Sequence, residues 1–183
     1  MIWFQKCEEG GWVVLILAQD FPALIDLPGR MRKLLESTEF SDKVVTRLFP
    51  QAYPKDPEAE AEYQRLLRND LLKRKLDVLE TVERSMAEMA CHTIPSGAKF
   101  YELRLSDTDL SAWLGFLHDM RLTIGTALDI TDESWESALD PDAQNFDEVL
   151  LLNQLSYFEE ALIEALRDAE GLDDEELDGK GDE

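Results

Sequence analysis

The sequence has few of the residues that build most recognisable sites. Only two cysteines and two histidines occur among its 183 residues, too few for a disulfide framework or a Cys/His zinc site. Lysine and arginine together number 18 against 40 aspartates and glutamates, which gives a formal net charge of −22. This excess of acid disfavours direct binding to a nucleic-acid backbone or to an anionic membrane.

Long hydrophobic runs are also missing. No stretch approaches the roughly 20 apolar residues of a membrane span. The apolar run 12–18 follows Glu8 and Glu9 rather than basic residues, and no small-x-small cleavage pattern comes after it, so no signal peptide is expected. We therefore expect a cytoplasmic protein without membrane association, whose thiols are reduced at rest.

The common catalytic and nucleotide-binding motifs are absent as well. The sequence contains no G-x-x-x-x-G-K-[ST], G-x-G-x-x-G or G-x-S-x-G pattern. A carboxylate-bridged di-metal bundle needs Glu three residues before His, but Met89 precedes His92 and Gly115 precedes His118. The sequence thus predicts no catalytic residue, no cofactor and no metal ligand.

What is present is enough apolar material for a core, since 44% of the residues are hydrophobic. Segments 2–7 and 12–17 are rich in aromatic and β-branched residues and flank Glu8-Glu9-Gly10-Gly11, which predicts a β-hairpin. The alternating segment 100–105 is the best candidate for a third strand, because an isolated hairpin is only marginally stable. Residues 93–99 are expected to form a loop.

Three long helices follow from the periodicity. Asp56-Pro57-Glu58 is a strong helix start, and apolar residues then recur at steps of three to five, including Leu66 and Leu67, to about residue 89. Ser106 is expected to cap a second helix to about residue 128, although Asp109 replaces the usual Glu or Gln of a capping box and makes its reciprocal bond less secure.

The third helix starts at Asp140 or Asn145 and ends near Ala169. Its apolar residues occupy more than one face, which is typical of a helix central to a bundle or in a subunit interface. Shorter helices are expected within 21–37, where prolines interrupt the pattern, and within 40–49.

These elements predict an α+β fold that is mainly α. It is a helical bundle with an N-terminal β-hairpin, which the third strand can extend to a three-stranded antiparallel sheet. Residues 1–170 form a single globular domain, and residues 171–183 form an acidic disordered tail.

Arg121 is one candidate anchor, because it lies within the apolar stripe of the second long helix. A guanidinium in that position needs an acidic partner, for which Glu159 or Glu80 on another helix are candidates. A structural ion pair and a role in binding a ligand carboxylate or a partner both remain open. Gly125 in the same helix suggests a close helix approach.

The densest basic cluster comprises Arg65, Arg68, Lys73, Arg74 and Lys75. These side chains can pair with nearby acids on an exposed helix face. They can also form a docking surface for an acidic partner or a phosphate contact.

Cys7 and Cys91 are candidate redox thiols, and each can equally be an ordinary small apolar residue. Cys7 can pair with Cys91 or with Cys7 of a second copy if the Cα atoms come within about 7 Å.

Three segments carry a family resemblance: RLFPQAY at 47–53, NDLLKRKL at 69–76 and HDMRLTIGTALDIT at 118–131. Together with the N-terminal hairpin they resemble the actinobacterial domain-of-unknown-function family that includes the AosR-type oxidative stress regulators. Genes of that family typically lie near the gene for the ClpS adaptor and near cysteine-biosynthesis genes. The resemblance implies redox sensing through a C-x-x-x-C pair in the hairpin and action on transcription with a sigma-factor partner. Cys7 matches the region, but Trp3 and Gly11 stand at the other two positions, so the pair is absent.

Three functions follow as hypotheses. The first is a non-enzymatic regulatory module that binds another protein, such as a sigma factor. The second is a small-molecule-binding or metabolic protein linked to cysteine biosynthesis, with Arg121 as its anchor. The third is a structural homodimer formed through the last helix.

Overall fold

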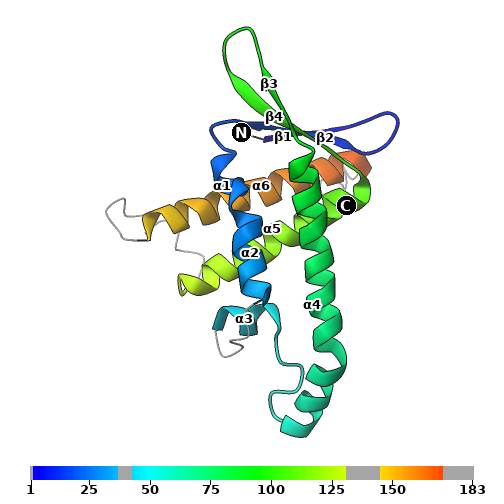
Figure 1. Ribbon diagram of the computed structural model, residues 1–183, viewed down its shortest axis with the longest axis vertical. Helices are drawn as coiled ribbons and strands as arrows, with labels where there is room; N and C mark the ends of the chain where they lie inside the picture. The colour runs from blue at the N-terminus through cyan, green and yellow to red at the C-terminus, as the bar shows by residue number, and fades with distance from the viewer. Residues whose placement is uncertain (1, 37–42, 131–144, 171–183) are drawn as a thin grey trace, which may run out of the picture.

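The computed structural model describes residues 2–36, 43–130 and 145–170. A four-stranded antiparallel sheet lies at one end of the molecule, and the helices lie on one side of it (Figure 1). The mainly helical α+β class is therefore confirmed. The expected tail 171–183 and the Asp140 start of the last helix lie outside the described residues.

The sheet has the order β1-β2-β4-β3, with β1 at Ile2–Lys6, β2 at Trp12–Leu17, β3 at Ala90–Thr93 and β4 at Lys99–Leu105. The hairpin and the strand near 100–105 are thus confirmed. The fourth strand, β3, was not predicted, and the expected loop 93–99 is a tighter turn closed by the amide of Ile94 on the carbonyl of Ala98 at 2.9 Å. All four residues of β3 are exposed, so the strand depends on backbone pairing and leaves no hydrophobic pattern in the sequence.

The hairpin turn requires glycine at one position above all. Gly11 has a φ of +77°, and a Cβ built on it would lie 2.7 Å from the carbonyl oxygen of Leu105. No other residue fits so close to a neighbouring strand without a shift of the backbone. The Gly-Gly pair is therefore needed for two reasons, the conformation of the turn and the close approach of β4 to β2.

The register gives the sheet two different faces. Trp12, Val14 and Ile16 alternate with half-exposed residues along β2 and are buried on the side that faces the helices. On the other side, Trp3 is 45% exposed and lies opposite Leu15. β2 lies inside the sheet between β1 and β4, a position that suits its continuous apolar sequence.

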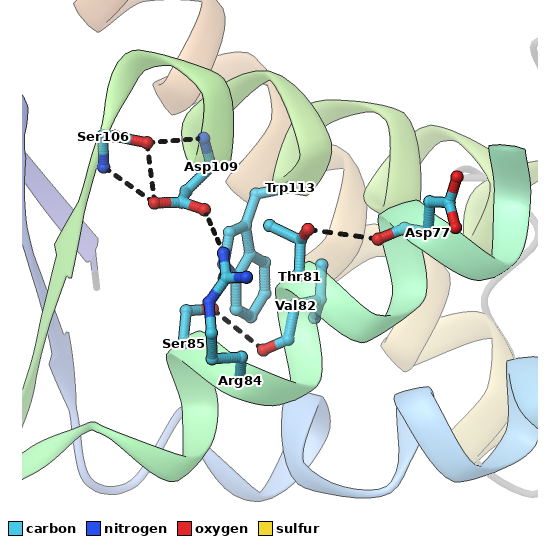
Figure 2. Close-up of polar contacts among 8 residues, drawn as sticks. All are labelled: Asp77, Thr81, Val82, Arg84, Ser85, Ser106, Asp109 and Trp113. Atoms are coloured by element: carbon cyan, nitrogen blue, oxygen red, sulfur yellow. Dashed lines mark hydrogen bonds and ion pairs between the residues drawn. The ribbon is translucent and has the colours of Figure 1, made fainter.

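The helices are α1 (Pro22–Ile25), α2 (Leu27–Glu36), α3 (Lys43–Leu48), α4 (Pro57–Ala87), α5 (Asp107–Ala127) and α6 (Phe146–Glu170). The three long helices confirm the periodicity argument, and the break between α1 and α2 follows the prolines. The capping box of α5 is complete, with the Ser106 amide on Asp109 Oδ2 at 3.1 Å and the Asp109 amide on Ser106 Oγ at 3.1 Å (Figure 2). The expectation of a less secure reciprocal bond was wrong, because the aspartate side chain reaches the cap.

One continuous core joins the sheet to the helices. Its most enclosed side chains are Phe116, Ile16, Leu24, Leu27, Leu79, Leu103, Leu110, Leu155, Leu162 and Val82. Among the described residues, no helix combines the length and apolar character needed to cross a membrane.

The apolar stripe of α4 is only partly used in this core. Leu79 and Val82 in its C-terminal half are fully buried, whereas Leu66 and Leu67 in its N-terminal half are 53% and 47% exposed. The periodic pattern correctly predicted the helix, but it could not show that Leu66 and Leu67 stay about half exposed while Tyr63 and Leu71 are in contact with other parts of the chain.

Candidate functional site

The N-terminal end of α4 projects past the other helices at the foot of the molecule (Figure 1). Asp56 starts this end of the helix, since its side chain accepts hydrogen bonds from the amides of Glu58 and Ala59 at 3.2 and 3.1 Å. Pro57 occupies the first turn, where its missing amide hydrogen costs nothing. The predicted helix start is therefore observed, and it holds an exposed helical end away from the core.

The segment before α4 is bound back onto the same helix. The amide of Tyr53 donates to Glu60 Oε2 at 2.8 Å, and the Tyr53 and Tyr63 rings meet edge to face at 6.0 Å. Hydrogen bonds from the Gln64 side chain and from Tyr53 lower the pKa of Glu60. Contacts between residues 53–64 thus hold the projecting end of α4 and the segment before it together.

A groove runs along this end of α4. It has a volume of about 160 Å³ and apolar walls that include Phe49, Pro50, Tyr63, Leu67 and Leu71. The exposed faces of Tyr53 and Leu66 lie on the same end of the molecule, at 50% and 53% exposure. Single exposed apolar residues are common on protein surfaces, but several at one projecting end, beside a groove with apolar walls, make this end a candidate interaction site.

Basic side chains lie along the groove. Arg68 and Arg74 line it, and the guanidinium of Arg68 lies 5.8 Å from the centre of the Phe49 ring. Between residues 63 and 75 five basic residues accompany a single acid, Asp70. We call the exposed residues Tyr53, Leu66, Leu67 and Arg74, together with the half-buried Arg68, the α4 tip surface.

The predicted basic cluster does not act as one patch. Lys75 does not contribute to an exposed basic patch, because its side chain is only 16% exposed and its Nζ lies 2.6 Å from Asp119 Oδ2 on α5. Arg65 forms an exposed pair with Glu62 at 2.7 Å, and this hydrogen bond lowers the pKa of Glu62. Lys73 and Arg74 are exposed. The cluster therefore divides into a helix-to-helix bridge at Lys75, a local pair at Arg65 and basic side chains beside the groove.

The two cysteines lie at opposite edges of the sheet. Cys7 follows edge strand β1 and is half-buried, whereas Cys91 is exposed on the other edge strand, β3. Two strands separate them, which at about 4.8 Å per strand puts the edges about 14 Å apart, beyond the reach of a disulfide. Both are free thiols, and the fold does not bring them together.

Arg121 has the partner that the sequence suggested. Its Nη1 donates to Glu159 Oε2 on α6, and Nδ1 of His118 lies 3.2 Å from the other oxygen of Glu159. Glu159 is only 6% exposed, so this carboxylate joins α5 to α6 beneath the surface. The close helix approach expected at Gly125 was wrong, because no atom of the described residues lies within 4 Å of a Cβ built there.

The last helix uses its apolar residues largely within the chain. Leu152, Leu155, Phe158 and Leu162 of α6 are all buried in the core, against α5 and β1. Its multi-faced pattern therefore reflects a central position, which leaves Tyr157 among its few exposed apolar side chains. Within the described parts of the chain, no group of three or more His, Cys, Asp or Glu side chains could hold a metal ion.

The sequence predicts only part of the α4 tip surface. It indicates the basic members as a docking candidate, but it places Leu66 and Leu67 in the apolar stripe of the helix. The available signal was helix geometry, because Leu66 and Leu67 lie about 140° and 120° around the helix from the buried Leu79.

Comparison with known proteins identifies a family without a described activity. The chain belongs to the DUF2017 family, a domain of unknown function, whose match covers residues 2–166. No curated protein matches the chain. No solved structure matches it either.

Proposed function

We propose that this DUF2017 chain is a non-enzymatic regulatory module that binds another protein through the α4 tip surface. The observation that carries the proposal is the exposure of Leu66 and Leu67, 53% and 47%, at the projecting end of a helix whose C-terminal half packs in the core. A folded chain that leaves two neighbouring leucines in water gains by covering them with a partner.

The charge beside the leucines defines the partner. Arg68 and Arg74 border the apolar groove in a chain whose formal net charge is −22. An acidic segment that inserts apolar side chains between them satisfies both features. Nucleic acid is the poorer candidate, because the rest of the surface repels its phosphates.

The family resemblance supports finer proposals about the setting. We infer a cytoplasmic protein of the AosR-related, actinobacterial type, which acts on transcription through a sigma factor or a comparable regulator. The free state of Cys7 and Cys91 is compatible with a reducing compartment. A response to oxidants would need a device other than a Cys7–Cys91 bridge, because two strands separate these residues.

The test begins with a photo-crosslinking amino acid at position 67 in an extract of the native cells. The captured protein is then purified, and its affinity for the chain is measured by calorimetry. We expect Leu67→Glu and Arg74→Glu each to weaken binding about tenfold or more, since a central apolar anchor and an interface charge dominate such contacts. The effect of Arg74→Glu should shrink as salt is raised.

Matched controls lie on other surfaces of the same chain. Leu150→Glu on α6 and Arg104→Glu on β4 change exposed residues, at 43% residue and 77% side-chain exposure, and should leave the affinity unchanged. Equal binding by all four variants contradicts the proposal. Capture of a second copy of this chain alone would favour the homodimer, and tight binding to duplex DNA by the pure protein would favour direct nucleic-acid recognition.

A further inference from the structure

A second hollow lies away from the α4 tip surface, between α3, α5 and α6. Its volume is about 430 Å³, which is the size of a site for a small organic molecule. Leu122, Ile130 and Leu152 supply apolar wall. We call this hollow the α3–α5–α6 cleft.

Basic side chains line the cleft from two helices. Lys43 and Arg47 come from α3, and His118 and Arg121 come from α5. Lys43 is neutralised by Asp129, whose Oδ1 lies 2.5 Å from its Nζ. Arg47 is exposed and makes no ion pair with any described residue. In so acidic a chain, a hollow lined by several basic side chains, one of them without an ion-pair partner among the described residues, is a local reversal of charge.

An ion pair fixes the position of Arg121, but not every nitrogen of its guanidinium group has a hydrogen-bond partner among the described residues. Within the described chain its ion-pair partner is Glu159, which binds Nη1, while its Nε is buried and has no hydrogen-bond partner. The side chain as a whole remains 37% exposed and lines the cleft. Because Glu159 also contacts His118, one buried carboxylate fixes the orientation of two groups that border the cleft. A planar guanidinium fixed in this way is suited to bind a carboxylate or a phosphate.

Gly125 explains why the cleft is open. It lines the cleft from the last turn of α5, and a Cβ built on it meets no atom of the described residues within 4 Å. Glycine in a helix is unfavourable relative to alanine, and here no close contact requires it. A side chain at position 125 would instead extend into the cleft.

We propose that the α3–α5–α6 cleft binds a small organic anion. Its carboxylate or phosphate group is held by Arg121 and Arg47, and its apolar part packs against Leu122, Ile130 and Leu152. The site is distinct from the α4 tip surface, so the chain has a place for a small ligand as well as a place for a partner.

The experiment measures binding of benzoate, phenyl phosphate and inorganic phosphate to the full chain by calorimetry, with the arginine Nε–Hε signals followed by NMR. We expect saturable one-to-one binding of an aromatic anion, with the Arg121 signal among those that shift. Benzyl alcohol, which has the ring without the charge, should not bind. Comparison of the two aromatic anions decides between carboxylate and phosphate.

Variants test the location. Gly125→Leu fills the cleft and should abolish binding, whereas Gly115→Leu is the matched control, because Gly115 lies on the same helix with equally free space and does not line the cleft. Arg47→Gln should weaken binding about tenfold, the usual effect of one lost charged contact. Glu159→Gln should strengthen binding, because it removes the internal counter-ion of Arg121.

Several outcomes would overturn the proposal. These are absence of saturable binding by both aromatic anions, equal binding by Gly125→Leu and Gly115→Leu, or binding of benzyl alcohol as tight as that of benzoate. Circular dichroism checks that each variant is folded, and Arg47→Gln alters an exposed side chain without an ion-pair partner among the described residues. Leu67→Glu should bind the anion normally, so a failure at the cleft and a failure at the α4 tip surface are distinguishable.

Discussion

At the scale of the residue, the clearest polar contact in the interior joins α4 to α5. The indole nitrogen of Trp113 donates to Ser85 Oγ at 2.8 Å, and Ser85 Oγ donates to the carbonyl of Val82 at 2.8 Å (Figure 2). Trp113 and Ser85 are each 6% exposed, so neither has ready access to water as a substitute. Ser85 thus supplies the acceptor that allows a tryptophan to be buried at this position.

Ser85→Ala should therefore destabilise the protein by about 1–3 kcal/mol, because it leaves the buried indole N–H without an acceptor. Urea denaturation followed by circular dichroism measures this change. The control is Thr81→Ala one turn earlier, whose hydroxyl donates to the Asp77 carbonyl on the exposed side of α4 (Figure 2) and which should cost less than about 0.5 kcal/mol. Equal effects of the two substitutions would contradict this account.

At the scale of the element, the start of α5 is attached to the last turns of α4. Asp109 accepts from the Ser106 amide at 3.1 Å and the Ser106 hydroxyl at 2.7 Å, while Arg84 Nη2 of α4 donates to its other oxygen at 2.7 Å (Figure 2). The same carboxylate therefore caps one helix and binds another. Lys75 and Asp119 make a second bridge between α4 and α5 further along.

These contacts decide the ionisation of Asp109. Partial burial alone would raise its pKa, but the hydrogen bonds from Ser106 and the charge and hydrogen bond of Arg84 outweigh burial and lower the pKa. A carboxyl with a lowered folded-state pKa stabilises the protein fully above the unfolded-state pKa of about 4, and this stabilisation is lost as the pH falls through the folded value.

Asp109→Asn should then cost about 1–2 kcal/mol near neutral pH, and the difference from the wild type should shrink below about pH 4. Unfolding by urea at a series of pH values measures both. Glu164→Gln, on the exposed face of α6, is the control and should show a small difference at every pH. A difference for Asp109→Asn that stays constant down to pH 2 would exclude the proposed role of its charge.

At the scale of the whole molecule, the sheet order decides what the cysteines can do. The order β1-β2-β4-β3 separates Cys7 at one edge from Cys91 at the other. Exposure also differs, since Cys91 is exposed and Cys7 is half-buried. The chain thus has two independent thiols with unequal access to reagents.

Treatment with diamide should therefore give no Cys7–Cys91 bridge within a monomer, because the two edges are about 14 Å apart. Iodoacetamide should label Cys91 before Cys7. Intact mass and peptide mapping under non-reducing conditions measure both results, with Cys91→Ser as the reference for labelling of Cys7. A linked Cys7–Cys91 peptide at monomer mass would show that the sheet opens or pairs differently.

The sequence by itself determined the elements of this fold. The Gly-Gly turn, the cap at Asp56 and the apolar periods act between residues close in the chain, so they can be read without knowing the fold. They predicted the hairpin, the strand near 100–105 and the three long helices. They missed β3, whose four exposed residues depend on pairing with β4.

Only the tertiary structure decided which of these residues meet. Glu159 is one of the two partners that the sequence suggested for Arg121. The sequence did not predict that Lys75 pairs with Asp119 and is therefore no longer available to the basic cluster. Leu66 and Leu67 lie about 140° and 120° around α4 from Leu79, and of the three only Leu79 is covered. Local patterns fix which face of a helix is apolar, whereas burial depends on how far the packed layers extend along that helix, and that is a property of the whole chain.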